Sequence, residues 1–238
     1  MIPYIDLKRF EENFLISWEK KVKELSMSAN YIGGREISLL ESKLSKITQN
    51  NYAITCANGT DAIQIALRSV GVKKNDLVLV PNLTFWSTFE AVVNVGALPI
   101  TIDADLRDGG ICFESFKKAI HLHKPKAALI AHLYGWGSRN LKRIRSLCKK
   151  HKVLLVEDGA QCFATKYLGD SIYKNALIST SSFYPAKVLG AAGDGGAVFT
   201  NNEKIARIAR KLSNHGRSDH YGHDYVGWNS RMDSLQAS

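Results

Sequence analysis

The sequence predicts an α/β protein with a mostly parallel sheet and helices on both faces. Short apolar runs, each about as long as one strand, alternate with stretches whose apolar residues recur at helical spacing. Near-continuous apolar runs are typical of strands buried on both faces, as in a parallel sheet covered by helices. A chain of 238 residues, 45% of them hydrophobic, is long enough to bury such a core.

The alternation extends along most of the chain. A mixed N-terminal helix comes first, and residues 231–238 are predicted to begin a last helix that the chain does not complete. Between them we expect strands at 52–57, 77–80, 98–102, 127–132, 153–157, 178–183 and 197–200, and helices at 60–70, 87–95, 113–123, 140–151 and 203–212.

Composition narrows the function classes. The net charge of +10 permits an anionic partner, but the basic residues lie along helix-like segments without a nucleic-acid-binding motif. We therefore expect solvated helix faces and no nucleic-acid or membrane partner, since no apolar run approaches the ~20 residues of a membrane span. The cysteines form no CxxC pair, which predicts reduced thiols in a cytoplasmic protein; they are Cys56, Cys112, Cys148 and Cys162.

Polar residues follow three of the predicted strands, where ligands bind in parallel sheets. Asn58-Gly59-Thr60-Asp61 lies between a strand and a helix, and free N–H groups at a helix N-terminus form a phosphate site. An ordinary helix cap made by Asn58 or Thr60 explains the same residues.

A second group follows the buried strand of the segment LLVEDGAQC. Asp158 is costly to bury there unless its carboxylate meets a cation, such as the pyridinium nitrogen of a cofactor. A carboxylate that caps the following turn is the alternative.

The third group is SSFYPAKVLGAAGDGG. Lys187 lies between a strand and a glycine-rich turn, where apolar neighbours favour the neutral amine that forms a Schiff base with an aldehyde. A surface charge is the alternative for an isolated lysine, and no GKS or GKT sequence indicates a Walker phosphate loop.

Together, these groups resemble the DegT/DnrJ/EryC1/StrS family of sugar aminotransferases, which depend on pyridoxal 5'-phosphate (PLP). The resemblance runs along nearly the whole chain, through the segments IPYIDLKR, YIGGREISLLESKL, CANGTDAIQIAL, VPNLTFWSTFEAV, HLYG, VEDGAQ, SFYPAKVLGAAGDGGAVFTN, NHGRSDH and GWNSRMDSLQA. It implies the large domain of a fold type I PLP-dependent transferase.

The resemblance also implies residue roles. Lys187 matches the lysine that binds the cofactor covalently and carries the transferred proton, and Asp158 matches the partner of the pyridine nitrogen. Gln161 matches the side chain near the ring 3-hydroxyl. Phe85 stands where an aromatic residue stacks on the ring, with Trp86 as the neighbouring candidate and a core role possible for either.

The remaining matches concern the phosphate. Gly59, Thr60 and Ser182 correspond to phosphate-binding positions, and Asn229 matches an asparagine that reaches the phosphate of a partner subunit. The resemblance therefore implies a homodimer with shared active sites.

Lys187 also separates two chemistries, because dehydratases of this family carry histidine at its position. The implied reaction is transamination from glutamate to a nucleotide-linked keto-sugar, in surface-polysaccharide or amino-sugar biosynthesis. The sugar, and amination at carbon 3 or carbon 4, stay open. The alternative is a truncated, non-catalytic PLP-fold protein that acts as a binding or regulatory partner.

The expected organisation has three parts. An N-terminal helical segment spans 1–30, a large PLP-binding α/β domain spans 31–215, and 216–238 form an active-site loop and the start of a missing C-terminal domain. The segment NHGRSDHYGHD carries three histidines at no known zinc-motif spacing, so we expect no metal site; they are His215, His220 and His223.

Overall fold

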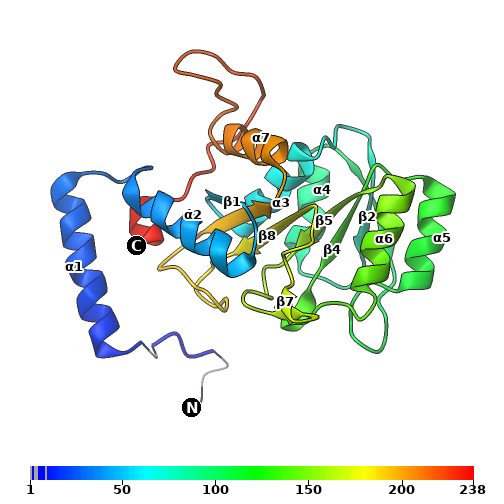
Figure 1. Cartoon of the computed structure of the whole chain (residues 1–238), viewed down its shortest axis with the longest axis horizontal. Helices are drawn as coiled ribbons and strands as arrows, with labels where there is room; N and C mark the ends of the chain where they lie inside the picture. The colour runs from blue at the N-terminus through cyan, green and yellow to red at the C-terminus, as the bar shows by residue number, and fades with distance from the viewer. Residues whose placement is uncertain (1, 3–4, 9) are drawn as a thin grey trace.

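A seven-stranded sheet forms the centre of the protein. Figure 1 shows the computed structural model, which describes residues 2, 5–8 and 10–238. Met1, Pro3, Tyr4 and Arg9, which belong to the predicted segment 1–30, lie outside the described residues. In spatial order the strands are β1 (Tyr52–Cys56), β9 (Gly196–Thr200), β8 (Ile178–Ser182), β5 (Leu154–Asp158), β4 (Ala127–Ala131), β2 (Leu77–Pro81) and β3 (Leu98–Ile102).

Six of the seven strands run in the same direction. The pairs β2–β3, β2–β4, β4–β5 and β5–β8 are parallel, and β9 runs antiparallel to both of its neighbours, β1 and β8. The carboxyl ends of β1, β2, β4, β5 and β8 therefore share one edge of the sheet. The predicted α/β class with a mostly parallel sheet is confirmed.

Helices cover both faces (Figure 1). One apolar core lies under α3 (Gly59–Ser69), α4 (Trp86–Asn94) and α7 (Glu203–Ser213). The other lies under α2 (Arg35–Thr48), α5 (Phe113–His123) and α6 (Leu141–His151). No helix formed by the described residues is both long and apolar enough to cross a membrane.

Local sequence explains where two of these helices begin. The side-chain oxygen of Asn58 accepts the backbone N–H of Asp61 at 2.8 Å, which caps α3. Asn202 caps α7 in the same way by accepting the N–H of Ile205 at 3.1 Å. Both asparagines follow the end of a strand, so each strand-to-helix connection is short.

Several elements differ from the prediction. The hairpin of β6 (Lys166–Tyr167) and β7 (Asp170–Ser171) was not predicted, because two-residue strands are too short to show a periodic pattern. Strand β5 includes Asp158, which we expected just beyond it. At the C-terminus, α8 spans only Ser234–Ala237, shorter than the helix expected at 231–238.

Two segments extend away from the sheet in Figure 1. Helix α1 (Glu12–Ser28) has a single buried residue, Leu25. The loop after α7 is closed at its base: His215 donates its N–H to the carbonyl of Trp228 at 2.7 Å. Gly216 has a positive φ of 74°, and a Cβ there would lie 1.8 Å from the carbonyl oxygen of Tyr225, so only glycine fits.

Truncation of a buried side chain of α5 should destabilise the fold. Phe116 is fully buried, and Phe116→Ala removes its ring contacts and leaves a cavity. We expect a loss of about 3–5 kcal/mol in the free energy of unfolding, measured by urea denaturation. The control Leu106→Ala, at a fully exposed side chain, should change it by less than about 0.5 kcal/mol. Equal effects of the two variants would contradict the packing described above.

Candidate functional site

A cleft of about 840 Å³ lies at the shared carboxyl edge of the strands. Most of its lining residues end or follow β1, β2, β4, β5 and β8, as expected for a ligand site in a parallel sheet. Seven of the eight predicted site residues line it: Gly59, Thr60, Phe85, Asp158, Gln161, Ser182 and Lys187. The eighth, Asn229, is exposed outside the cleft and forms an isolated β-bridge with Asn214.

Asp158 presents a buried carboxylate to the cleft. It is 7% exposed and ends β5. Thr88 donates its hydroxyl to Oδ2 at 2.9 Å, and the N–H of Ala160 donates to Oδ1 at 3.0 Å. Both donors are neutral, and no cationic side chain in the described part of the chain forms an ion pair with Asp158. The carboxylate is therefore available to a cationic group of a ligand.

The N-terminus of α3 forms another part of the cleft wall. Because Asn58 caps the helix through Asp61, the predicted alternative of a cap is correct for Asn58, while Gly59 and Thr60 still line the cleft. A Cβ on Gly59 would lie 2.6 Å from the Cβ of Ser182, so glycine permits the contact between α3 and the end of β8. The Thr60 and Ser87 hydroxyls are hydrogen-bonded at 2.7 Å. Hydroxyls and helix N–H groups suit a phosphate.

Gln161 is oriented by a neighbouring backbone group. Its Oε1 accepts the N–H of Tyr134 at 2.7 Å, so the amide NH₂ remains as the donor that the side chain can offer to a ligand. Tyr134 adopts a left-handed conformation, with φ of 59°, that non-glycine residues seldom adopt. The strained residue therefore fixes the amide at the cleft.

Lys187 lies in the turn after β8 and is half-buried. Its N–H donates to the carbonyl of Tyr184 at 2.8 Å, which closes a tight turn. A Cβ on Gly190 would lie 2.5 Å from the carbonyl oxygen of Pro185, so the segment after the lysine needs glycine to fold back. The turn keeps Lys187 in the same cleft as Asp158.

The two aromatic candidates are separated. Phe85 is 69% exposed and lines the cleft, whereas Trp86 stacks on Phe89 with ring centroids 5.2 Å apart and does not line it. The structure thus places only Phe85 where it could contact a ligand in the cleft.

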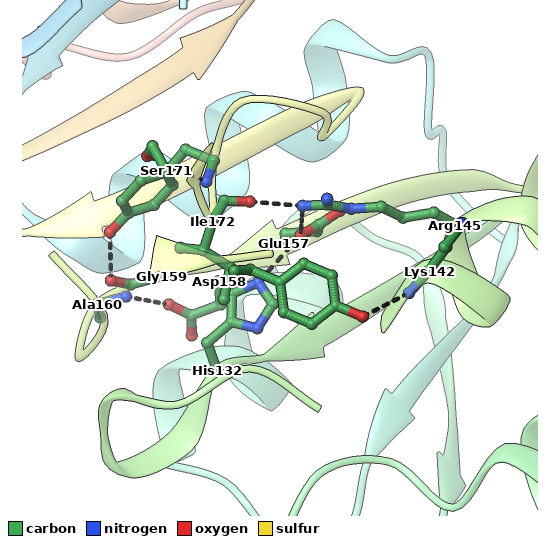
Figure 2. Close-up of polar contacts among 11 residues, drawn as sticks. His132, Lys142, Arg145, Glu157, Asp158, Gly159, Ala160, Ser171 and Ile172 are labelled. Atoms are coloured by element: carbon green, nitrogen blue, oxygen red, sulfur yellow. Dashed lines mark hydrogen bonds and ion pairs between the residues drawn. The ribbon is translucent and has the colours of Figure 1, made fainter. Parts of the chain in front are cut away.

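The residue after the apolar part of β5 is a second buried acid. Figure 2 shows Glu157, which is 0% exposed, between Arg145 of α6 and His132. Arg145 donates Nε to Oε1 at 2.7 Å and Nη2 to Oε2 at 2.8 Å, and His132 Nε2 lies 3.0 Å from Oε2. Burial raises the pKa of Glu157, but the hydrogen bonds from His132 and Arg145 outweigh burial, and the pKa is lowered.

Sequence reasoning missed several of these residues. Thr88 is 70 residues from Asp158 along the chain, and nothing in its local pattern marks it as a partner. The signal for Glu157 was visible, because an acid inside an apolar strand needs a buried partner.

The cysteines and histidines do not add a second site. All four cysteines are free, and all but Cys112 are buried. Among the described residues, no group of three or more His, Cys, Asp or Glu side chains is arranged to hold a metal ion.

The donor set fits a PLP molecule. A half-buried lysine amine, a carboxylate without a cationic partner, and a helix N-terminus with adjacent hydroxyls all line one cleft. These groups are complementary to an aldehyde, a protonated ring nitrogen and a phosphate.

Comparison with known proteins identifies the relatives. A UDP-2-acetamido-2-deoxy-3-oxo-D-glucuronate aminotransferase from Pseudomonas aeruginosa is 35% identical over 238 residues, covering 100% of this chain and 66% of that protein. The crystal structure of S. venezuelae DesV in complex with a ketimine intermediate matches with a TM-score of 0.94 and 33% identity, over 99% of this chain and 63% of the other.

A third match bears on the cofactor. The structure of NtdA from Bacillus subtilis, with bound cofactor PMP, has a TM-score of 0.91 and 30% identity over 99% of this chain and 54% of that one. The chain thus spans less than two thirds of the length of these three relatives. The model of the DegT/DnrJ/EryC1/StrS aminotransferase family matches residues 17–238. The chain therefore belongs to this family, whose members depend on PLP.

Proposed function

We propose that the chain carries the cofactor-binding part of an aminotransferase that moves an amino group from glutamate to a nucleotide-linked keto-sugar. The observation that carries the proposal is the presence of Lys187 and Asp158 in one cleft, together with the phosphate-binding features of α3. Lys187 in place of histidine favours transamination over dehydration.

The proposed roles follow from the chemistry of each group. When bound, PLP supplies an aldehyde carbon and a ring that accepts electrons. Lys187 is the residue whose Nζ would hold that carbon, and as a free amine it would hold and deliver a proton. Asp158, whose own hydrogen-bond donors are neutral, would hold a protonated ring nitrogen by charge pairing, and the free NH₂ of Gln161 would donate to the ring 3-oxygen.

The phosphate and the ring face have their own residues. We assign the phosphate to Gly59, Thr60 and Ser182. Gly59 begins α3 and packs directly against Ser182, which ends β8. Phe85 is assigned to stacking on the ring, because its exposed side chain lines the cleft.

The substrate class is supported by the Pseudomonas relative, whose name gives a UDP-linked 3-oxo sugar as its substrate. A net charge of +10 suits an anionic nucleotide sugar. Surface-polysaccharide or amino-sugar biosynthesis in the cytoplasm is the proposed setting. The proposed assembly is a homodimer in which Asn229, exposed outside its own cleft, reaches the phosphate of the partner subunit.

Removal of the Lys187 amine should abolish covalent cofactor binding. After addition of PLP, the protein should show a visible absorption band that Lys187→Ala lacks, because no other lysine among the described residues lines the cleft to bind the aldehyde. L-glutamate should then convert the wild-type band to the shorter-wavelength pyridoxamine form. Lys204→Ala, at an exposed lysine of α7, is the control and should keep the band. A wild-type protein without the band would favour the non-catalytic alternative.

A methyl group on Gly59 should weaken PLP binding. In Gly59→Ala the new Cβ would lie 2.6 Å from the Ser182 Cβ, so the two phosphate-site segments must separate. We expect at least about tenfold weaker binding, equivalent to about 1.4 kcal/mol, in a fluorescence titration with PLP. In the control Gly193→Ala, the added carbon meets only the end of the Gln236 side chain, at 3.3 Å. Unchanged affinity in Gly59→Ala would remove Gly59 and Ser182 from the phosphate site.

A further inference from the structure

Three side chains at the cleft or directly behind it have no part in the proposed reaction, and His132 is the one of them that lines the cleft. His132, Glu157 and Arg145 form a continuous hydrogen-bonded group, here called the Glu157 network (Figure 2). A buried ion pair of this kind adds little net stability, because desolvation of the charges offsets their attraction. Net stability therefore does not explain why these polar groups are buried together.

The network is joined to Asp158 in two ways. Glu157 and Asp158 are consecutive residues at the end of β5, and successive side chains of a strand point to opposite faces of the sheet. Glu157 accordingly meets Arg145 of α6, while Asp158 meets Thr88 of α4. The backbone N–H of His132 also donates to the carbonyl of Asp158 at 2.9 Å, so the residue whose imidazole contacts Glu157 is joined directly to the strand end that carries the Asp158 carboxylate.

The cysteine and tyrosine side chains near Glu157 do not carry charge at neutral pH. Burial raises the pKa of Cys148 on α6 and of Cys162 after β5 to about 12. Burial also raises the pKa of Tyr173, whose hydroxyl donates to the carbonyl of Gly159 at 2.8 Å. Arg145 is thus the cation that compensates Glu157, and a third hydrogen bond, from its Nη2 to the Ile172 carbonyl at 2.6 Å, fixes it there.

We propose that the Glu157 network is a positioning and charge-balancing group for Asp158. Through Asp158 it sets how strongly the site favours positive charge on the bound cofactor. The inference rests on the proposed function, which assigns Asp158 to the ring nitrogen. In the ionised network the charges of Glu157 and Arg145 cancel, so Asp158 contributes its negative charge without a competing charge on the other face of β5.

Acid titration tests whether the network is ionised, without any cofactor. Glu157 has a lowered pKa in the folded protein, so its ionisation stabilises the fold above the unfolded-state pKa of about 4.3, and this contribution is lost as pH falls below it. The isosteric Glu157→Gln variant lacks this contribution. The difference in free energy of unfolding between wild type and Glu157→Gln should therefore shrink from about pH 6 to about pH 3. A difference that stays constant would show that Glu157 is not ionised and would overturn the proposal.

The pH midpoint of the visible band of bound PLP tests the link to Asp158. The protonated lysine–cofactor linkage is cationic, so an added positive charge nearby lowers its midpoint. Glu157→Gln leaves Arg145 uncompensated, and we expect the midpoint to fall by about 0.5–1 pH unit. The double variant Glu157→Gln/Arg145→Met removes both charges, and its midpoint should return toward that of wild type. Ile144→Val, at a fully buried neighbour on α6, is the control for loosened packing and should leave the midpoint unchanged.

The outcomes separate the two proposals. A larger fall in the double variant than in Glu157→Gln, or an equal fall in Ile144→Val, would mean that packing alone is responsible and would overturn the inference. If the double variant fails to fold, Arg145→Lys replaces it, because this variant keeps the positive charge. A midpoint near that of wild type would then support the proposal. A shift equal to that of Glu157→Gln would overturn it. Absence of the band in wild type would instead refute the proposed function, and this inference with it.

Discussion

Strand direction is the constraint on which the rest of this structure depends. Because β1, β2, β4, β5 and β8 run in the same direction, their following loops all begin at one edge of the sheet. Gly59 and Lys187 are distant in sequence, but each follows a strand that ends at this edge, so both line one cleft. Strand β9 runs in the opposite direction, so its start lies at this edge. Asp194, which precedes β9, therefore also lines the cleft.

Alternation along β5 adds a second constraint, because it separates two adjacent acids. Glu157 is directed into the core beneath α6, and Asp158 toward α4. The two carboxylates also differ in their partners, since Glu157 has a guanidinium and an imidazole, and Asp158 has a hydroxyl and a backbone N–H. The charge of Glu157 is compensated within the protein, whereas the charge of Asp158, which is held by neutral donors, stays available to a ligand. The same strand thus supplies both kinds of acid.

The sequence predicted the elements of the fold and the position of the cleft because both depend on local patterns. Helix α5 begins and ends where its apolar spacing indicated, and Lys187 and Asp158 were found from their position after apolar strands. Side-chain partners were not predictable in this way. The contacts from Thr88 to Asp158 and from Tyr134 to Gln161 join residues 70 and 27 positions apart, and each depends on how strands are ordered in the sheet. Strand order leaves no trace in the hydrophobic pattern of a single strand.

The anchored base of the loop after α7 limits the conformational entropy that the loop would lose if another molecule bound to its tip. Its base is fixed by the hydrogen bond from His215 to Trp228 and by the close approach of Gly216 to Tyr225, while its tip, including Tyr221, is exposed. Further hydrogen bonds, from the Ser218 N–H to the Gly222 carbonyl and from the Asp224 N–H to the Gly216 carbonyl, both at 2.9 Å, also hold the residues of the tip. A molecule that contacted the tip would restrict only those residues, so more of the contact energy would remain as affinity than for an unanchored segment of equal length.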